Sequence, residues 1–592
     1  MRFTKFTVLA RSSFLSTPAR WVRRFGGVLL LLAVWLLYSA NVGTPLVFDD
    51  QSFFGGNYTS VFGGAFRPDL PRFWPYASFA HQHLLFGQSP EEMHTVNFLL
   101  HGLCLLFLQA LIAKLLATAD ANDGSDFRPT VRHELVAFCV TALFAVHPAA
   151  VYAVAYLVQR SMLVGTFFSL LMWQAYLMAL QGGAKRWLAW SVVFYYFAAF
   201  SKEHAVLAPL FPLGLTVLLW KARTARAGAQ PSLAMLATTF GAYALIAVAV
   251  TLPAVKLLGT GYEPLLSYFP EGADWHQRIG LLERMHWMSI LTQCGLFFKY
   301  LWLWLWPDPT AMSIDMREPL LSDLSIPGNW LGLFGWLAFG VLMLSLLWYA
   351  RRSQNKRIGL FSLGLLTIWG LFIVELMTVR WQEIFVLYRS YLWMTGLAIA
   401  LAVVLNILVE RLRSNWVLLL CVPLFILLVN SAQQRLQTFT SELSVWNDAV
   451  QLIERRVAKQ GHVVGDERAY NNRGVAYARA QDYQHALADY GKAISLNPNY
   501  EAFYQSRGKA QAELGQYQDA LASFEKALAI RPSFMSALVN HALTLERMGR
   551  KGEALTELER ACDAGEIWGC IVHHKRTRSN ETLIYLPKRA AQ

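Results

Sequence analysis

The chain has 592 residues, of which 55% are hydrophobic and only 15% are charged. Soluble domains carry about 25% charged residues, so this composition excludes a simple soluble enzyme, and it also excludes a disordered or collagen-like chain. The net charge is +13, and most of the basic excess lies in the apolar part, as expected when Lys and Arg mark cytoplasmic loops. We therefore expect a membrane-embedded region followed by a soluble region, and no nucleic-acid partner.

The first element is a basic tail, residues 1–24, which contains six Lys or Arg and no acidic residue. This charge pattern predicts that the tail stays in the cytoplasm. No small-residue cleavage site follows the apolar run 25–38. We therefore interpret the run as a retained first span rather than as a signal peptide.

Residues 25–431 are predicted to form a helical transmembrane domain. A membrane-spanning helix needs about 20 mostly apolar residues, and eleven uncharged stretches meet or approach that length. They centre on 25–41, 93–113, 135–156, 161–181, 187–200, 204–220, 232–255, 327–349, 358–378, 391–409 and 415–431. An odd number of spans with an inner N-terminus places the C-terminus outside.

Four later basic clusters agree with eleven spans, because all of them then lie on the inner side. They are Lys185/Arg186, Lys221/Arg223/Arg226, Arg351/Arg352/Lys356/Arg357 and Arg411/Arg413. The apolar stretch Met285–Trp306 would break the pattern if it crossed, and it contains Lys299 and ends in Pro307-Asp308-Pro309. We interpret it as a re-entrant or interfacial helix in a long outer loop, residues 256–326, with a twelfth span as the alternative.

A connecting segment, residues 432–465, leads into a sequence that repeats every 34 residues. Arg473-Gly474 recurs as Arg507-Gly508, Pro498 as Pro532, and Ala486 as Ala520 and Ala554. This spacing is typical of tetratricopeptide helix pairs. We predict an α-solenoid of three repeats over 466–567 on the outer side, followed by a C-terminal tail, 568–592. Its expected role is to bind a peptide or protein, and the alternative is a structural cap or dimerisation element.

The six cysteines fall into two groups. Four lie in or near apolar stretches and are expected to be packing residues, namely Cys104, Cys139, Cys294 and Cys421. The other two, Cys562 and Cys570, lie in the outer region, where an oxidising compartment would permit a disulfide. No Cys/His spacing is typical of a zinc site.

Chemistry is most plausible in the first outer loop, residues 41–92. Asp49 and Asp50 follow the first span directly, and adjacent carboxylates at a membrane surface are costly without a role. One of them could accept a proton from an attacking hydroxyl, while the other orients it or binds a cation. The alternative is a solvated pair that caps a helix end.

Further polar residues are predicted to emerge on the same outer side. They are His147, Gln159, Arg160, Lys202, Glu203, Glu383, Arg389 and Tyr391. Several such groups on one face indicate a polar site at the membrane surface. Its cations would suit the phosphate of a lipid, although Lys202 and Glu203 could also simply pair with each other.

The order of these motifs resembles a known family. It comprises Asp49-Asp50, Leu143-Phe144-Ala145-Val146-His147-Pro148, Val158-Gln159-Arg160, Ser201-Lys202-Glu203, Leu291-Thr292-Gln293 with Tyr300 and Pro307, and the C-terminal repeats. Together they resemble the transmembrane and tetratricopeptide repeat O-mannosyltransferases. More broadly, they are similar to polyprenol-dependent glycosyltransferases of the GT-C superfamily, including bacterial pilin-type enzymes.

The resemblance implies an enzyme that moves a sugar from a polyprenyl-phosphate carrier to a hydroxyl of an exported, possibly pilin-like, protein. It implies Asp49 or Asp50 as catalytic base. Candidate ligands of the donor phosphate are Arg160, Lys202 and Arg389, with His147 as a hydrogen-bond partner. Supporting residues are Glu203, Glu383, Tyr391 and Gln293. A bridging divalent cation is left open. This chain has only three clear repeats, where the animal proteins usually have more, and it has an aromatic-rich segment at 297–306. The acceptor and the sugar are therefore left open as well.

Two other functions are weighed against this one. The first is a transferase acting on a glycan or lipid, or an oligosaccharide ligase. The second is a non-enzymatic membrane scaffold whose repeats assemble a secretion or pilus complex, although a scaffold needs only one anchor. We expect a bacterial inner membrane with a cytoplasmic N-terminus and periplasmic repeats, and an endoplasmic reticulum location would follow the same logic.

Overall fold

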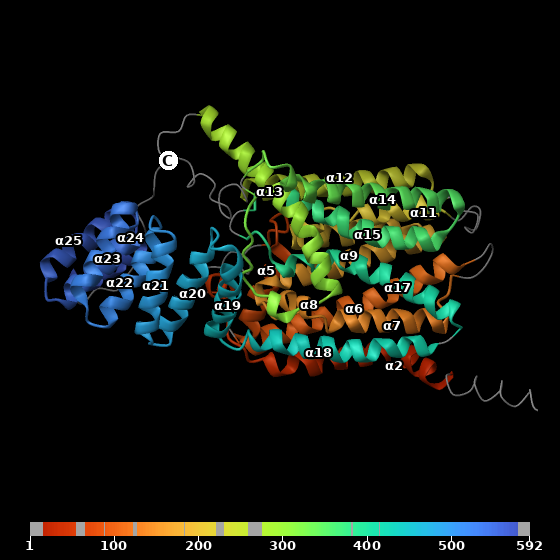
Figure 1. Ribbon diagram of the computed structural model, residues 1–592, viewed down its shortest axis with the longest axis horizontal. Coiled ribbons are helices and arrows are strands. Elements are labelled where there is room, and N and C mark those ends of the chain that lie inside the picture. Colours follow the sequence, from red (N-terminus) through yellow and green to blue (C-terminus); the bar gives the residue numbers. More distant parts are fainter. Residues whose placement is uncertain are drawn as a thin grey trace, which may run out of the picture. The chain divides into compact units, whose positions relative to one another are not determined.

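The computed structural model describes residues 16–54, 66–87, 89–121, 127–182, 184–220, 230–257, 275–321, 323–380, 383–413 and 415–577. Within them the secondary structure is helical, apart from one isolated antiparallel bridge between Met316 and Phe385. The chain divides into two compact units, Met1–Ser441 and Glu442–Gln592 (Figure 1). Most of the predicted basic tail, the cluster Lys221/Arg223/Arg226 and the end of the predicted C-terminal tail lie outside the described residues.

The first unit is built from long helices. In chain order they are α2 (Ser16–Tyr38), α3 (Asp49–Phe54), α5 (Phe73–Phe86), α6 (Pro90–Asp120), α7 (Val131–Ala145), α8 (Pro148–Val154), α9 (Arg160–Leu180), α10 (Arg186–Ser201), α11 (Leu210–Leu219), α12 (Leu233–Leu257), α13 (Trp275–Leu305), α14 (Leu331–Ser353), α15 (Lys356–Leu376), α16 (Ser390–Trp393), α17 (Thr395–Arg411) and α18 (Cys421–Gln437).

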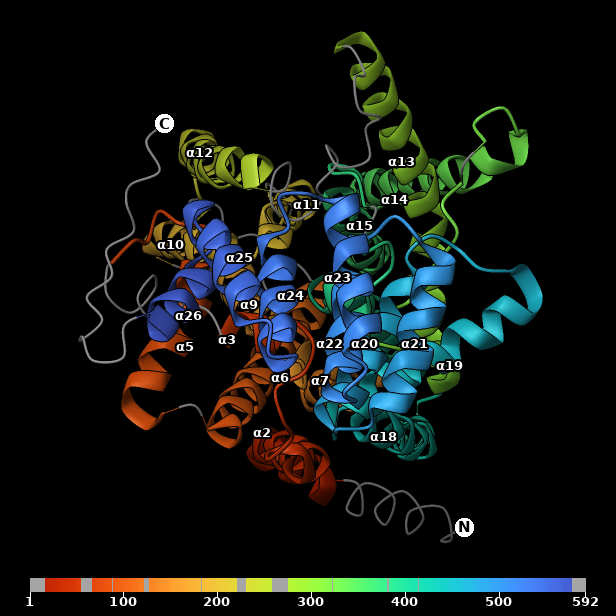
Figure 2. The same ribbon diagram turned by 90° about the vertical axis from the view of Figure 1, so that its left-hand side faces the viewer.

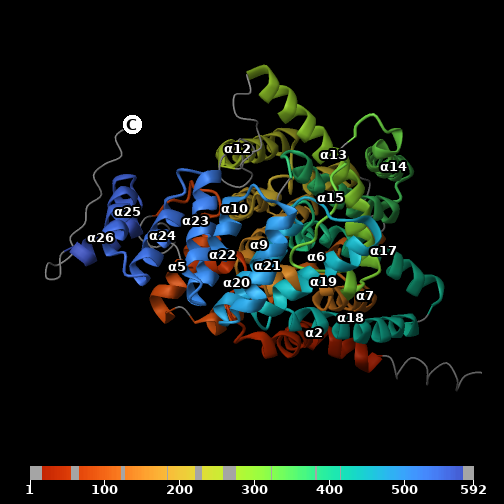
Figure 3. The same ribbon diagram turned by 60° about the vertical axis from the view of Figure 1, so that its left-hand side comes forward.

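The core of this unit lies where α6 packs against α7, α9, α15 and α17. Figures 1 and 3 show these helices side by side. Helices α12, α14 and α18 are less buried than α9 and keep large apolar side chains exposed, among them Leu245, Val341 and Leu424. Exposed apolar faces of this kind are compatible with helices that contact lipid, since water would disfavour so much apolar surface.

Six described helices are long and apolar enough to cross a membrane, and the number rises to eight if two bent pairs each count as one span. The segments Phe25–Asn41 and Glu203–Leu219 are apolar but shorter. The structure therefore supports several spans, whereas the predicted number of eleven stays a prediction. The stretch predicted to be re-entrant lies within α13, which is not among these candidate spans.

The first of the two bent pairs has a local cause. The pair α7 and α8 bends by 68°, and the pair formed by Leu387–Trp393 and α17 bends by 52°. At the first bend Pro148 begins α8. A proline is tolerated there because the N–H that it lacks would have no hydrogen-bond partner within the helix. His147 caps the new helix, because its Nδ1 accepts the N–H of Ala149 at 3.2 Å. His147 Nε2 must then carry the proton, and it donates to the carbonyl of Trp304 at 3.1 Å.

The second unit is a stack of short helices (Figure 2). They are α19 (Glu442–Gln460), α20 (Asp466–Arg479), α21 (Tyr483–Leu496), α22 (Glu501–Glu513), α23 (Tyr517–Ile530), α24 (Met535–Arg547), α25 (Lys551–Asp563) and α26 (Ile567–Thr577). Helices α20 to α25 form three successive pairs, and each pair packs on the next. Helix α26 occupies the first part of the predicted C-terminal tail.

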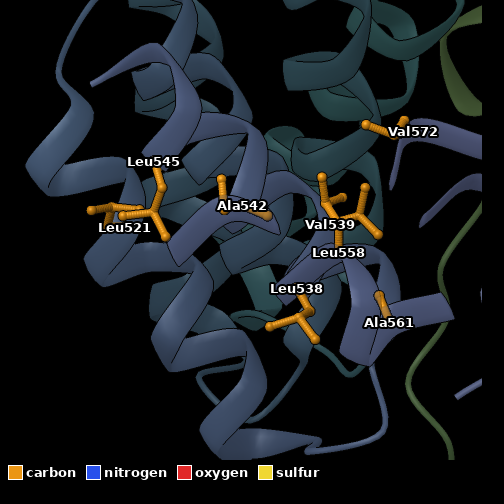
Figure 4. Close-up of a cluster of buried hydrophobic side chains, with 9 residues drawn as sticks. Leu521, Leu538, Val539, Ala542, Leu545, Leu558, Ala561 and Val572 are labelled. Atoms are coloured by element: carbon orange, nitrogen blue, oxygen red, sulfur yellow. The ribbon is translucent and has the colours of Figure 1, made fainter. Parts of the chain in front are cut away.

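Small residues set the spacing within the pairs. A Cβ added at Gly474 would lie 2.7 Å from the ring of Tyr490, and one at Gly508 would lie 2.7 Å from Phe524. In the third pair the equivalent residues are Ala542 and Leu558, and both belong to the apolar cluster of Figure 4. That cluster draws on α23, α24, α25 and α26, so each helix pair buries its apolar face only against its neighbours.

The expected disulfide between Cys562 and Cys570 is present, and it joins α25 to α26. The remaining cysteines are free, as expected of packing residues. Cys104 and Cys294 are buried, whereas Cys139 and Cys421 are partly buried.

Candidate functional site

The acidic pair begins α3, directly after a residue with a left-handed backbone, Phe48 at φ 54°. Asp50 is only 1% exposed. Its Oδ1 accepts the backbone N–H of Val158 at 2.8 Å, and its Oδ2 accepts that of Val47 at 3.5 Å. Burial raises the pKa of Asp50 from 3.8 to about 8, although the backbone hydrogen bonds oppose the rise. Asp50 thus ties the start of α3 to the segment before α9.

Asp49 is more accessible than Asp50, because its side chain is half-buried. Its backbone N–H donates to the hydroxyl of Tyr156 at 3.3 Å. The ring of Tyr156 in turn lies 6.1 Å from the ring of Tyr388. The acidic pair is therefore close to the segment that contains Arg389, far along the chain.

Lys202 follows α10 in an extended conformation and is 4% exposed. Its Nζ lies 3.4 Å from Gln159 Oε1, 4.0 Å from Glu203 Oε1 and 5.8 Å from the centre of the Tyr388 ring. Burial lowers the pKa of Lys202 from 10.5 to about 7. The contact with Glu203 is long because Arg72, directly before α5, donates to both Glu203 oxygens, at 2.5 and 3.0 Å.

Glu375, at the end of α15, is the centre of the surrounding charges and is 1% exposed. Its oxygens lie 2.7 Å from His204 Nε2, 3.2 Å from Arg389 Nη1 and 3.2 Å from Arg380 Nε. Arg389 also donates to Glu383 Oε2 at 2.6 Å. We call the whole group the Glu375 network, which comprises Arg72, Lys202, Glu203, His204, Glu375, Arg380, Glu383 and Arg389.

Sequence reasoning missed two members of this network, Arg380 and Glu375. A signal was present for Glu375, which is the one acidic residue within the predicted span 358–378. An ionisable residue inside an apolar span indicates a functional or structural site by default. Arg380 carried no comparable signal, since it lies in a loop.

Arg160 lies nearby, and each of its three nitrogens donates to a protein acceptor. Its Nε donates to Asn97 Oδ1 at 2.8 Å, its Nη1 to Ser78 Oγ at 3.1 Å and its Nη2 to the Met93 carbonyl at 2.9 Å. The guanidinium also covers the ring of Phe79 at 3.6 Å. These contacts hold α5, α6 and α9 together beside Gln159.

Two predicted supporting residues have other partners. Tyr391 is buried, and its hydroxyl lies 2.6 Å from His101 Nδ1 on α6. Gln293 on α13 donates to the carbonyl of Ile384 at 2.6 Å, one residue after Glu383. Gln293 therefore fixes the backbone next to the Glu375 network, whereas Tyr391 links α16 to α6.

A second charged group, which we call the Asp120 cluster, lies where α6 ends. It comprises Asp120, Arg132, His133, Arg357, Asn406 and Glu410. Asp120 Oδ1 accepts from Arg357 at 2.6 Å, while its Oδ2 contacts Arg132, His133 and Asn406. Glu410 receives Arg132 at 2.9 Å and Arg357 at 2.6 Å. The cluster thereby joins the ends of α6, α7, α15 and α17.

Within the described ranges, no group of three or more His, Cys, Asp or Glu side chains is arranged to hold a metal ion. The possible divalent cation therefore has no ligand set that can be named from these residues.

Comparison with known families identifies the second unit in part. Models of the tetratricopeptide repeat match residues 467–500 and 502–534. The second unit contains tetratricopeptide repeats. They coincide with the pairs α20–α21 and α22–α23, and the pair α24–α25 follows with the same period. No curated protein matches the chain.

Proposed function

We propose that the chain is an integral membrane glycosyltransferase that moves a sugar from a polyprenyl-phosphate carrier to a hydroxyl of an exported protein. The observation that supports it most is the meeting of remote motifs. The Asp50 carboxylate accepts the backbone N–H of Val158, and the backbone N–H of Asp49 donates to the Tyr156 hydroxyl. The Tyr388 ring lies 6.1 Å from the Tyr156 ring and 5.8 Å from Lys202 Nζ. Carboxylates and a buried cation from separate segments thereby share one neighbourhood, as an acid–base and phosphate site requires.

In this proposal the acceptor oxygen attacks the anomeric carbon of the sugar. The bond from that carbon to the phosphate oxygen breaks, and the phosphate leaves with the electron pair. Asp49 takes the proton of the acceptor hydroxyl, because its carboxylate is the more accessible of the pair. Asp50, held by two backbone N–H groups, positions Asp49 against Tyr156.

Lys202 stabilises the departing phosphate in the proposed reaction. It is the cation of the Glu375 network whose nearest carboxylate oxygen is farthest away, at 4.0 Å. A bound phosphate raises the pKa of Lys202 and keeps it charged. Arg389 is held by Glu375 and Glu383 and shapes the site beside Lys202. Arg160 positions α5, α6 and α9, and His147 caps the bend between α7 and α8.

In this proposal the repeats bind the acceptor protein. Tetratricopeptide arrays generally bind proteins, and here they would recruit the acceptor. A bacterial inner membrane, with the N-terminus in the cytoplasm and the repeats in the periplasm, accommodates the Cys562–Cys570 disulfide, because the periplasm is oxidising.

The test is mass spectrometry of exported proteins from cells that carry the wild type, Asp49→Asn or Asp50→Asn. We expect Asp49→Asn to lower transfer about 10²- to 10⁴-fold, the usual contribution of a general base. Asp69→Asn is the matched control, since Asp69 lies in the same loop but is exposed and paired with Arg67. Unchanged glycosylation in the Asp49→Asn cells, with normal membrane insertion, would contradict the proposal.

The pH profile distinguishes the two carboxylates. A base works only when ionised, so a rate that rises as the pH increases through about 8 would assign the base to Asp50, whose pKa is raised to about 8. A rate already on a plateau at neutral pH assigns it to Asp49. Transfer to glycans or lipids alone would indicate the alternative transferase or ligase, and no transfer at all would favour a scaffold.

A further inference from the structure

Three residues occupy the same position of successive repeats, at intervals of 34: Arg473, Arg507 and His541. Each lies on the first helix of its pair. The residue 16 positions later lies on the second helix and faces it, and these three residues are Asp489, Ser523 and Glu557. We call each facing pair of helices at this position a seam: Arg473 and Asp489 mark the first, Arg507 and Ser523 the second, and His541 and Glu557 the third. The three equivalent seams can therefore be compared within one chain.

In the first seam the cation is neutralised. Arg473 binds Asp489 with two hydrogen bonds, both of 2.8 Å. In the third seam His541 contacts Glu557 at 2.7 Å and also Glu525, from the preceding pair, at 3.7 Å. Two separate positions of the repeat thus supply carboxylates to this seam.

The middle seam lacks both carboxylates. Arg507 donates its Nε to Ser523 Oγ at 3.1 Å and lies over the ring of Tyr504. The position equivalent to Glu525, one repeat earlier, is Gly491, and a Cβ added there would meet nothing within 4 Å. In the part of the chain that the structure describes, Arg507 therefore forms no salt bridge, and an exposed glycine stands where the third seam has a glutamate.

A half-buried guanidinium without a counter-charge is unfavourable, because burial removes water that would solvate it. The guanidinium also presents a planar set of donors that matches a carboxylate with two parallel hydrogen bonds. We propose that Arg507 binds a carboxylate of the partner protein, which enters beside Ser523 and Gly491. This inference rests on the partner-binding part of the proposed function and names the chemistry of that partner.

The experiment measures binding rather than transfer, so that the two proposals fail separately. The full-length protein in lipid nanodiscs is titrated against a fluorescent Gly-Glu-Gly-Glu-Gly-Glu peptide, and binding is followed by fluorescence anisotropy. The same peptide with Gln for Glu is the neutral control. Amidation of the C-terminus distinguishes a side-chain carboxylate from a terminal one, since only the latter is lost.

Three variants test the site. Arg507→Gln should weaken binding at least about tenfold, because hydrogen bonds to charged groups are stronger than neutral ones. Ser523→Asp and Gly491→Glu rebuild the partners of the first and third seams, so they should preserve folding and also weaken binding. Arg547→Gln, at an exposed arginine paired with Glu513, carries the same loss of charge and should leave binding unchanged.

The results can overturn the inference in two ways. Equal binding by Ser523→Asp and the wild type would show that Arg507 is not the ligand, even if Arg507→Gln failed to fold. Equal binding of the Glu and Gln peptides, or no binding of either, would show that the seam does not select a carboxylate.

Discussion

The Asp120 cluster and the Glu375 network contain opposite ends of the same helix, α15, and they balance charge differently. In the Asp120 cluster two arginines face two carboxylates, and each carboxylate receives both arginines. In the Glu375 network four Lys or Arg face three glutamates, if His204 is counted as neutral. The first group is balanced, whereas the second, counted without the neighbouring Asp49 and Asp50, has one cation more than it has glutamates.

The surplus belongs to Lys202, whose nearest carboxylate oxygen is 4.0 Å away. A balanced cluster has the properties of a structural clamp between helices. An unbalanced and buried one retains positive potential that an anionic ligand can complete. The comparison therefore separates charges that hold the fold from the charge to which we assign a role in the proposed reaction.

The largest expected effect is on stability, from Glu375→Gln. The substitution leaves Arg380, Arg389 and His204 buried without their shared carboxylate, and breaking such a buried pair costs about 3–5 kcal/mol. We expect a clear fall of the thermal midpoint in detergent. Glu410→Gln is the control, since Glu410 also binds two arginines but is 43% exposed, and it should lose far less. Equal falls of the thermal midpoint in the two variants would mean that the burial of Glu375 does not make it more important for stability than Glu410.

Lys202→Met should separate function from stability. The change removes a buried, incompletely neutralised charge, so we expect the free energy of unfolding to stay the same or rise by about 1 kcal/mol. Transfer should nevertheless fall about 100-fold, the usual loss when one charge-stabilising group is removed. The two quantities are measured by thermal melting and by sugar transfer from a polyprenyl-phosphate donor. A destabilised but active variant would make Lys202 a structural residue.

Asp120→Asn should have the smallest effect. Arg132 and Arg357 are partly exposed, and both keep Glu410 as a partner. We expect a loss of about 1 kcal/mol, near the upper end for exposed pairs, and unchanged transfer per folded molecule. A selective loss of transfer would show that the Asp120 cluster also serves the reaction.

The sequence predicted those parts of the fold that depend on local pattern. The 34-residue period predicted the helix pairs, because equivalent positions repeat the same packing, with Gly474 and Gly508 each against a large ring of its own pair in the first two repeats. Hydropathy indicated several membrane spans. The predicted number of eleven spans also depended on helices that are too short or too bent to count as single spans by length and composition. The sequence also predicted that Asp49 and the segment before Arg160 share one side of the helical unit, and the two lie close together.

Partner choice in the candidate site could not be predicted in the same way. Glu203 is adjacent to Lys202 in the sequence, yet it pairs with Arg72, 131 residues away. Arg160 and His147 were expected near the donor phosphate, but their contacts hold helices together. Hydropathy and charge order determine which side of a membrane a residue faces, whereas helix packing determines which charge it meets.

Helix α15 carries Arg357 near its start and Glu375 near its end. At 1.5 Å per residue these positions are about 27 Å apart, close to the hydrocarbon thickness of a bilayer. Ion pairs at both positions prevent the helix from sliding along its axis. A bilayer of a different thickness must then adapt to the protein, by lipid compression or by tilting of the whole bundle. The two charged groups would thus set the preferred membrane thickness of the first unit.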